Sequence, residues 1–171
     1  VFCTFHLFLN LFFWIKLQDG ENIFYLSKRI GKDNKEFILY KFRSMKNTKS
    51  EEERVRITSF GKFIRSTRID ELPQLINIIK GDMTLIGPRP ETPTLFKEYS
   101  NQISFYGIRQ SIKPGLSGYA QIYQEQNIVP KFGLEINATK DKLSYDIYYL
   151  KHRSLFMDIS LILKTIKKQL F

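Results

Sequence analysis

Prolines and glycines divide residues 65–90 into short pieces, and this stretch restricts the fold more than any other part of the sequence. It reads RSTRIDELPQLINIIKGDMTLIGPRP. A helix expected over residues 60–69 must kink or restart at Pro73, because proline lacks an amide hydrogen and clashes with the preceding turn. The short helix that follows has a natural C-terminal stop at Gly81. Residues 87–90, Gly-Pro-Arg-Pro, then predict a turn with little backbone freedom.

The rest of the chain combines strand patterns with helix patterns. Short strands are expected at residues 23–26 and 36–45, and further helices at residues 91–106, 139–151 and 154–170. Polar or Pro/Gly-rich composition predicts loops at residues 46–53 and 113–118. The sequence shows no internal repeat and no low-complexity tract.

The expected helix at residues 154–170 has an apolar stripe opposite three lysines. The stripe consists of Leu155, Ile159, Ile162, Leu163, Ile166 and Leu170, and the lysines are Lys164, Lys167 and Lys168. Such a helix packs on a protein core with a solvated basic face, or it lies on an anionic lipid surface. The pattern leaves both interpretations open.

Length and charge limit the classes of protein that the chain can belong to. At 171 residues it is long enough for one domain with a core. Its 27 Lys and Arg against 17 Asp and Glu give a net charge of +10, which attracts phosphates in nucleic acid, lipid headgroups or nucleotides. We find no groove-reading helix or base-stacking motif, so nucleic acid is not an expected partner. The single cysteine, Cys3, excludes an intrachain disulfide.

Residues 1–15, VFCTFHLFLNLFFWI, contain twelve apolar residues. A membrane-spanning helix needs about 20, and a basic start and cleavage site for a signal peptide are both absent. The stretch is therefore a buried core helix, an interfacial or re-entrant membrane segment, or the end of a longer hydrophobic segment. Its aromatic residues favour contact with a membrane. We expect a membrane-associated segment at residues 1–15 and a catalytic domain at residues 16–171.

Asp70 and Glu71 are adjacent carboxylates that follow two arginines. Neighbouring residues of a helix point about 100° apart, so two such carboxylates can flank one phosphate–metal centre. One would attack phosphorus while the other helps to hold a divalent cation. The alternative is structural: acidic residues also stabilise the start of a helix, here ahead of Pro73. Residue types alone leave both open.

Basic residues near this pair suit phosphate binding. Arg89 lies between two prolines, which would direct its guanidinium group with little backbone freedom. Lys41 and Arg43 are two residues apart on an expected strand and would face the same side. A rigid surface loop and a solvated strand face explain the same residues equally well.

The run DELPQLINIIKGDMTLIGPRP resembles, nearly position by position, the signature of the bacterial sugar transferases, the monotopic phosphoglycosyl transferases. RIGKDNKEFILYKFRSM is similar to the upstream block of the family. IKPGLSGYAQI resembles its Pro-Gly loop, and KLSYDIYYLKHRSLFMDISLILKTIKK resembles its C-terminal helices. The resemblance covers about residues 20–169.

This resemblance implies a fold and a set of roles. The fold is a compact α+β catalytic domain with amphipathic helices at the membrane interface and an N-terminal re-entrant helix, here expected to be truncated. Asp70 matches the aspartate nucleophile, and Glu71 matches its partner in an acidic dyad associated with Mg²⁺, so both are expected at the metal. Arg65 and Arg89 match basic residues near the phosphates, and Lys41 and Arg43 fall in the basic strand motif.

The implied reaction transfers a sugar 1-phosphate from a UDP-sugar to polyprenyl (undecaprenyl) phosphate and releases UMP, as the first step of a bacterial surface glycan. The implied location is the cytoplasmic face of the bacterial inner membrane, in contact with membrane lipid. The sequence leaves open a homodimer, the identity of the sugar, and a non-catalytic relative that acts as a scaffold in the same pathway.

The sequence differs from the family pattern at two places besides its N-terminus. Ser27 stands where glutamine is usual. After Gln121, the common Asn-Gly-Arg-Asn is replaced by Tyr123-Gln124-Glu125-Gln126-Asn127 and a longer insert through Ala138. We expect this insert to touch the sugar or the nucleotide.

Overall fold

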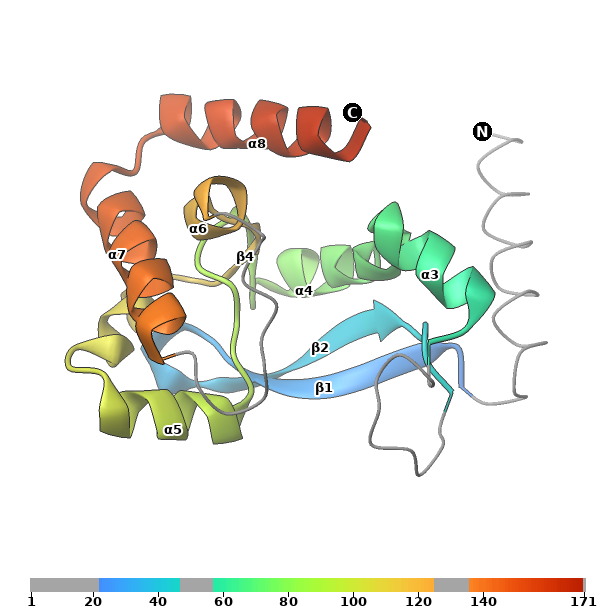
Figure 1. The fold of residues 1–171 in the computed structure, drawn as a ribbon, viewed down its shortest axis with the longest axis horizontal. Coiled ribbons are helices and arrows are strands. Elements are labelled where there is room, and N and C mark those ends of the chain that lie inside the picture. The colour runs from blue at the N-terminus through green and yellow to red at the C-terminus, as the bar shows by residue number, and fades with distance from the viewer. Residues whose placement is uncertain (1–21, 47–56, 125–135, 171) are drawn as a thin grey trace. The chain divides into compact units, whose positions relative to one another are not determined.

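The computed structural model describes residues 22–46, 57–124 and 136–170. These residues form an α+β structure that is mostly helical and has two small sheets, which confirms the predicted fold class (Figure 1). Within the described ranges, no helix is both long and apolar enough to cross a membrane. The predicted membrane segment at residues 1–15 lies outside these ranges, and so does nearly all of the predicted loop at residues 46–53.

Residue contacts divide the chain into two compact units. The first contains Val1–Leu26 and Tyr40–Leu75, and the second contains Ser27–Leu39 and Ile76–Phe171. A β-hairpin and one helix, α4, continue from one unit into the other. The expected dyad belongs to the first unit and Arg89 to the second, so each is described within its own unit.

The hairpin consists of β1 (Phe24–Ile30) and β2 (Glu36–Phe42). Its turn contains a short 3₁₀ segment, η1 (Lys32–Asn34), in which two residues have positive φ. Asp and Asn tolerate this conformation better than other side chains, which places the turn here. The predicted strand boundaries were wrong: β1 is longer because pairing with β2 extends it, and β2 ends at Phe42, where its partner begins.

In the first unit, helix α3 (Ser59–Ser66) begins at the cap residue Thr58, whose hydroxyl accepts a hydrogen bond from Gly61 N at 2.8 Å. A Cβ atom at Gly61 would lie 2.0 Å from the Ser44 carbonyl oxygen, so only glycine permits this approach of helix to chain. Ile64 is fully buried and packs with Phe42. The helix is shorter than predicted because the chain turns into a left-handed conformation two residues after it.

Helix α4 (Gln74–Lys80) restarts directly after Pro73, as the sequence predicts. It ends at Gly81, whose φ of 82° is the left-handed conformation that glycine adopts at helix ends. Inside the second unit, the buried Asn77 side chain donates to the Ile38 carbonyl oxygen at 2.7 Å. This bond attaches α4 to the hairpin.

The second sheet pairs β3 (Thr84–Ile86) with β4 (Gly115–Ser117) in parallel. The connection between them contains α5 (Pro93–Gln102) and a 3₁₀ segment, η3 (Tyr106–Ser111). The prediction of a plain loop at residues 113–118 was therefore wrong, because parallel pairing with a distant segment leaves no local signal. Helix α5 is shorter than the predicted 91–106.

Three helices complete the second unit: α6 (Tyr119–Tyr123), α7 (Ile136–His152) and α8 (Leu155–Leu170). The last two confirm the predicted C-terminal helices. One buried cluster joins Ile86, Tyr149 and Leu161, and a second joins Ile103, Tyr106 and Leu143. The Tyr149 hydroxyl also donates to Asp158 at 2.7 Å and so connects α7 to α8.

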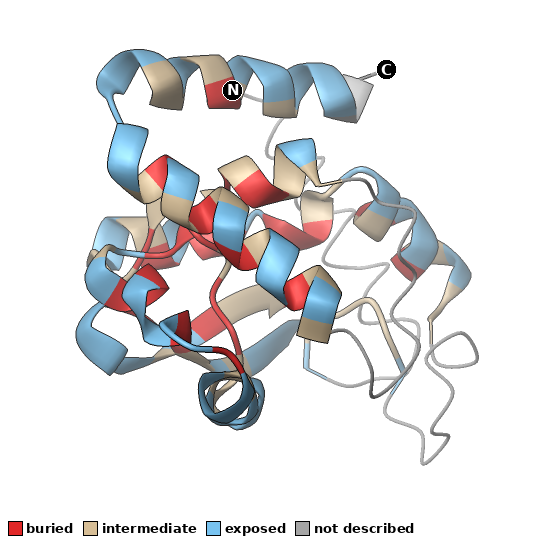
Figure 2. Cartoon of the chain, turned by 60° about the vertical axis from the view of Figure 1, so that its left-hand side comes forward, coloured by how far each residue is buried: buried red, intermediate tan, exposed pale blue. Residues whose placement is uncertain are grey.

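Helix α8 packs on the core through Leu161, which is 1% exposed, and not through most of the predicted stripe. Leu155 and Leu163 in that stripe are 78% and 63% exposed. Figure 2 shows the uppermost helix, α8, with much of its surface pale blue. The helix therefore presents both exposed apolar side chains and exposed lysines.

Candidate active site

The acidic pair lies on a single 3₁₀ turn, η2 (Ile69–Glu71). The turn begins after Arg68, which has φ 56° and ψ 14°, and Glu71 N donates to the Arg68 carbonyl oxygen at 3.0 Å. A left-handed conformation is unusual for arginine and costs energy that the surrounding contacts must supply. Asp70 and Glu71 are only 8% and 7% exposed. The turn thus holds two adjacent carboxylates in a mostly buried position.

Both carboxylate oxygens of Glu71 are paired with cations. Lys41 Nζ lies 3.0 Å from Oε1, and Arg68 Nη1 lies 3.4 Å from Oε2. The structure therefore brings the predicted Lys41 to the predicted Glu71. These pairs orient Glu71 and offset its charge in a mostly desolvated position.

Asp70 differs from its neighbour because no described residue gives its carboxylate a hydrogen bond or an ion pair. Burial raises the pKa of Asp70 above its ordinary value, and Glu71 acts in the same direction. Lys41, Arg65 and Arg68 oppose that rise, so all three lie near enough to act on the Asp70 charge. A carboxylate that no described residue binds can approach an incoming atom without first breaking a contact with those residues.

The remaining predicted residues of the first unit are Arg65 and Arg43. Arg65 is half-buried in the last turn of α3 and acts on Asp70 through its charge. Arg43 lies one residue beyond β2, where its amide donates to the Ile23 carbonyl oxygen at 2.8 Å. Its side chain is half-buried.

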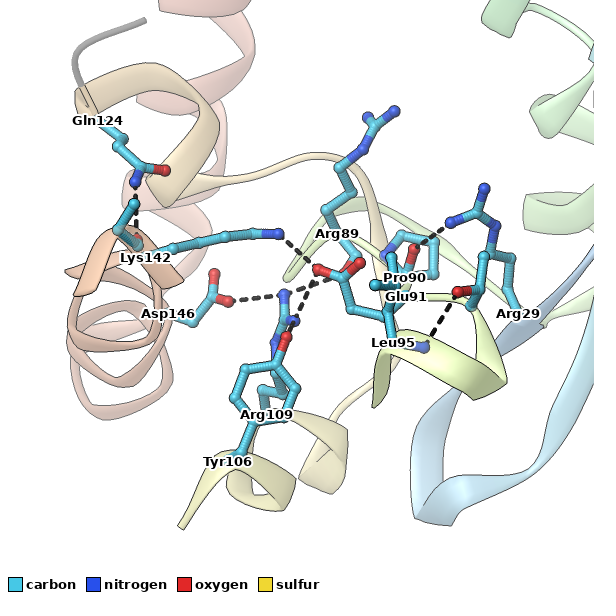
Figure 3. A network of polar contacts seen from close by, with 12 residues as sticks. Arg29, Arg89, Pro90, Glu91, Leu95, Tyr106, Arg109, Gln124, Lys142 and Asp146 are labelled. Carbon is cyan, nitrogen blue, oxygen red and sulfur yellow. Dashed lines mark hydrogen bonds and ion pairs between the residues drawn. The ribbon is translucent and has the colours of Figure 1, made fainter. Parts of the chain in front are cut away.

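In the second unit, Arg89 lies between buried Pro88 and Pro90, as the Gly-Pro-Arg-Pro turn predicts. Its carbonyl oxygen accepts a hydrogen bond from Arg109 Nη2 at 3.0 Å. Figure 3 shows the Arg89 side chain extending away from the polar network beside it. Arg89 therefore combines a fixed backbone with a half-buried side chain that points away from this network.

The polar network in Figure 3 centres on Arg109, which is 2% exposed. Its guanidinium group lies 3.1 Å from Glu91 Oε1 and 2.8 Å from Asp146 Oδ2, and it donates to the Tyr106 hydroxyl at 2.5 Å. Lys142 lies 2.5 Å from the same Glu91 oxygen. Two cations and two carboxylates thus join the turn at Arg89 to η3 and α7.

The network fixes the charge of its acids in different ways. Burial alone would raise the pKa of Glu91, but Lys142 and Arg109 lower it to about 2. Burial raises the pKa of Asp146, with Arg109 and Lys142 opposing it, and burial raises the pKa of the Tyr106 hydroxyl as well. The neighbouring acids raise the pKa of Arg109 and so keep its positive charge.

The donor set at the dyad suits Mg²⁺ only together with a substrate. In the part of the chain that the structure describes, no group of three His, Cys, Asp or Glu side chains could hold a metal ion. Mg²⁺ commonly binds one or two carboxylates, with substrate phosphates and water as the other ligands. Asp70 and Glu71 fit that arrangement, although Glu71 already shares both oxygens with cations.

The family model described as bacterial sugar transferase matches residues 1–171, the whole of the sequence. The chain belongs to the bacterial sugar transferase family. This membership confirms the resemblance carried by residues 65–90 and the blocks around them.

Relatives of this chain come from several bacteria. It is 41% identical over 160 residues to UDP-N-acetylgalactosamine-undecaprenyl-phosphate N-acetylgalactosaminephosphotransferase of Aeromonas hydrophila, which covers 90% of this chain and 36% of that protein. It is 33% identical over 162 residues to UDP-glucose:undecaprenyl-phosphate glucose-1-phosphate transferase of Xanthomonas campestris pv. campestris, covering 88% and 32%. The uncharacterized sugar transferase EpsL of Bacillus subtilis is 33% identical over 173 residues, covering 98% and 80%. The chain spans about a third of the length of the first two relatives.

Arg68, Glu91, Arg109 and Asp146 were not among the predicted site residues. Arg68 could have been found, because it stands three residues before Glu71 and that spacing suits an ion pair. The network residues come from three separate segments, and charged residues are ordinarily exposed. Their meeting therefore follows from tertiary packing alone.

Proposed function

We propose that this chain transfers a sugar 1-phosphate from a UDP-sugar to polyprenyl phosphate, with undecaprenyl phosphate as the acceptor that the names of its relatives suggest. The observation that carries the proposal is the dyad turn. A buried aspartate, whose carboxylate has no hydrogen bond or ion pair from the described residues, stands beside a glutamate that pairs with two cations. Family membership supports the same reaction class.

Asp70 is the proposed nucleophile. Its carboxylate oxygen attacks the sugar-bearing phosphorus of the UDP-sugar, and the bond from that phosphorus to the UMP oxygen breaks, so that UMP leaves with the electron pair. An oxygen of polyprenyl phosphate then attacks the same phosphorus, and Asp70 leaves as a carboxylate. Covalent catalysis splits one difficult exchange between anions into two steps.

The basic residues lower the cost of bringing anions together. Arg65 and Lys41 act on the charge of Asp70, and Arg89 offers a guanidinium group from a rigid turn. We assign these three residues and Arg43 to the phosphates of the donor or the acceptor. Guanidinium groups bind phosphate oxygens in a bidentate manner, which suits them to charge that develops during phosphoryl transfer.

Asp70 and Glu71 are the residues that would hold Mg²⁺, which supplies further charge neutralisation at the phosphates when it is bound. Lys41 and Arg68 would keep Glu71 oriented toward that position. The arrangement predicts that Mg²⁺ binds weakly to the protein alone and more tightly with a UDP-sugar present, because the phosphates complete the ligand set. Isothermal titration with and without the donor measures the difference.

A lipid acceptor requires access to a membrane, and we place the protein at the cytoplasmic face of the bacterial inner membrane. The exposed apolar side chains of α8 and its lysines support this location, since such helices bind anionic lipid surfaces. We further infer that α8 is one of the interfacial helices expected for a monotopic enzyme.

The first test is UMP release from a panel of UDP-sugars with Mg²⁺ and polyprenyl phosphate in detergent or nanodiscs. Wild type is expected to release UMP from at least one sugar, and Asp70→Asn is expected to lose about 10⁴-fold or more of that rate, as when other nucleophiles are removed. Glu98→Gln, an exposed acid on α5, is the matched control and should keep wild-type turnover. Wild-type turnover by Asp70→Asn would remove Asp70 from the mechanism.

The scaffold alternative predicts a different outcome. A non-catalytic relative would bind a UDP-sugar, seen as a thermal shift, and would release no UMP from any member of the panel. That result, repeated with a version that carries a longer membrane segment, would replace the transferase proposal with the scaffold.

A further inference from the structure

The backbone around Arg89 is held at every carbonyl group from residue 88 to residue 91. Each of these four consecutive oxygens accepts a hydrogen bond from a different donor. The bonds are Gly115 N to Pro88 O at 3.0 Å, Arg109 Nη2 to Arg89 O at 3.0 Å, Arg29 Nη1 to Pro90 O at 3.3 Å, and Ile30 N to Glu91 O at 2.9 Å. The prolines on both sides of Arg89 fix their own φ angles and restrict the residue before them.

The bond to Arg89 itself comes from the buried side chain of Arg109. The same guanidinium group also pairs through Nη1 with Glu91, which belongs to the same turn, and through Nη2 with Asp146, which comes from α7. A guanidinium group can do this because it presents five donors in one rigid plane. A lysine carries a point charge on a flexible stem and would satisfy fewer of these partners at once.

We propose that Arg109 is a positioning residue, which holds the Arg89 carbonyl and thereby directs the Arg89 guanidinium group at the phosphates of the UDP-sugar. This inference rests on the proposed function of Arg89 in donor binding. Arg109 does not touch substrate: its guanidinium group is buried among protein groups, and Figure 3 shows it on the opposite side of the Arg89 backbone from the Arg89 side chain. Its effect reaches the reaction through the peptide that follows Arg89.

Small errors in position are costly in phosphoryl transfer. A displacement of about 1 Å in a substrate-binding group can reduce turnover about 100-fold. Arg109→Lys keeps the positive charge in the network but loses the planar group that reaches two carboxylates and the Arg89 carbonyl. We expect this variant to lower kcat/KM for the UDP-sugar by about 10- to 100-fold.

The test is a double-mutant cycle measured as UMP release. The proteins are wild type, Arg89→Ala, Arg109→Lys and the double variant, with Arg153→Lys, an exposed arginine, as a matched control that keeps wild-type turnover. Because Arg109 acts through Arg89, Arg109→Lys should lower kcat/KM by less than about 3-fold when it is made in the Arg89→Ala variant. If Arg109 had only a structural role, Arg109→Lys would lower kcat/KM by the same factor with arginine or alanine at position 89. Equal factors would overturn the inference.

A second variant covers the case in which Arg109→Lys fails to fold, and wild-type activity separates failure of the positioning role from failure of the proposed function. If Arg109→Lys does not fold, Asp146→Asn goes through the same cycle, since it releases Arg109 from α7, and the same dependence on Arg89 is expected. Active wild type with equal losses in both backgrounds rejects the positioning role alone. Inactive wild type with every donor rejects the proposed function and the positioning role with it.

Discussion

Asp70 on the dyad turn and Glu91 in the Arg109 network are both buried acids with cations nearby, yet their pKa values are displaced in opposite directions. Glu91 is in direct contact with Lys142 and Arg109, which lower its pKa to about 2. Asp70 has no contacting partner among the described residues, and burial raises its pKa. Two cations in direct contact thus keep Glu91 charged, whereas Asp70 is buried without such a contact, as we expect of an acid that reacts.

The largest expected effect comes from the same chemical change at the two positions. Glu91→Gln leaves the buried Arg109 and the half-buried Lys142 without their shared carboxylate, and we expect it to lower the free energy of unfolding by about 3–5 kcal/mol. Asp70→Asn removes a carboxylate whose charged form burial already disfavours, so its stability should stay within about 0.5 kcal/mol of wild type or increase. Urea denaturation at pH 7 measures both. Similar losses of unfolding free energy for Glu91→Gln and Asp70→Asn would contradict the difference between these two acids.

A smaller effect is expected from two lysines of the hairpin. The side chains of Lys41 and Glu71 are 18% and 9% exposed, and Lys41 Nζ lies 3.0 Å from Glu71 Oε1. The side chains of Lys28 and Glu36 are 69% and 52% exposed, and Lys28 Nζ lies 3.7 Å from Glu36 Oε2. Lys41→Met should cost about 1–3 kcal/mol, because it removes a cation from a buried carboxylate. Lys28→Met should cost about 0.5 kcal/mol or less, as for most exposed pairs. Equal costs would show that burial does not strengthen the Lys41–Glu71 pair.

A dependence of stability on pH follows from the same carboxylate. The pKa of Glu91 is about 2 in the folded protein against an ordinary value of 4.5, so the folded state favours its charged form. Its contribution to stability is complete above about pH 4.5 and is lost as the pH falls toward 2. The stability gap between wild type and Glu91→Gln should therefore narrow below pH 4.5. Both proteins contain Asp146, so its titration affects them alike. A stability difference that stays constant below pH 4.5 would contradict the low pKa of Glu91.

Much of the fold could be predicted where local chemistry decides it. Pro73 and Gly81 set the limits of α4, and the spacing of apolar residues located α7 and α8. Local chemistry could not predict the short sheet of β3 and β4, because parallel partners are joined by a long connection. It also overestimated α3, since the left-handed conformation of Arg68 that follows it has no sequence signature.

The candidate site likewise contains residues that local sequence predicts and residues that only tertiary packing brings together. The family signature predicts Asp70, Glu71 and Arg89 as site residues, and the structure shows that the predicted Lys41 contacts Glu71. The groups that hold these residues could not be identified. Arg109 and Glu91 are 18 positions apart, and nothing in a sequence distinguishes a buried ion pair from two exposed charges.

Mass spectrometry tests most directly whether Asp70 carries the sugar phosphate as a covalent intermediate. The protein is mixed with Mg²⁺ and the UDP-sugar that gives UMP release, without polyprenyl phosphate, and then quenched and digested. We expect one added sugar phosphate on the peptide that contains Asp70, its disappearance on addition of polyprenyl phosphate, and no adduct in Asp70→Asn. An adduct on another residue, or full UMP release with no adduct at any time, would contradict it.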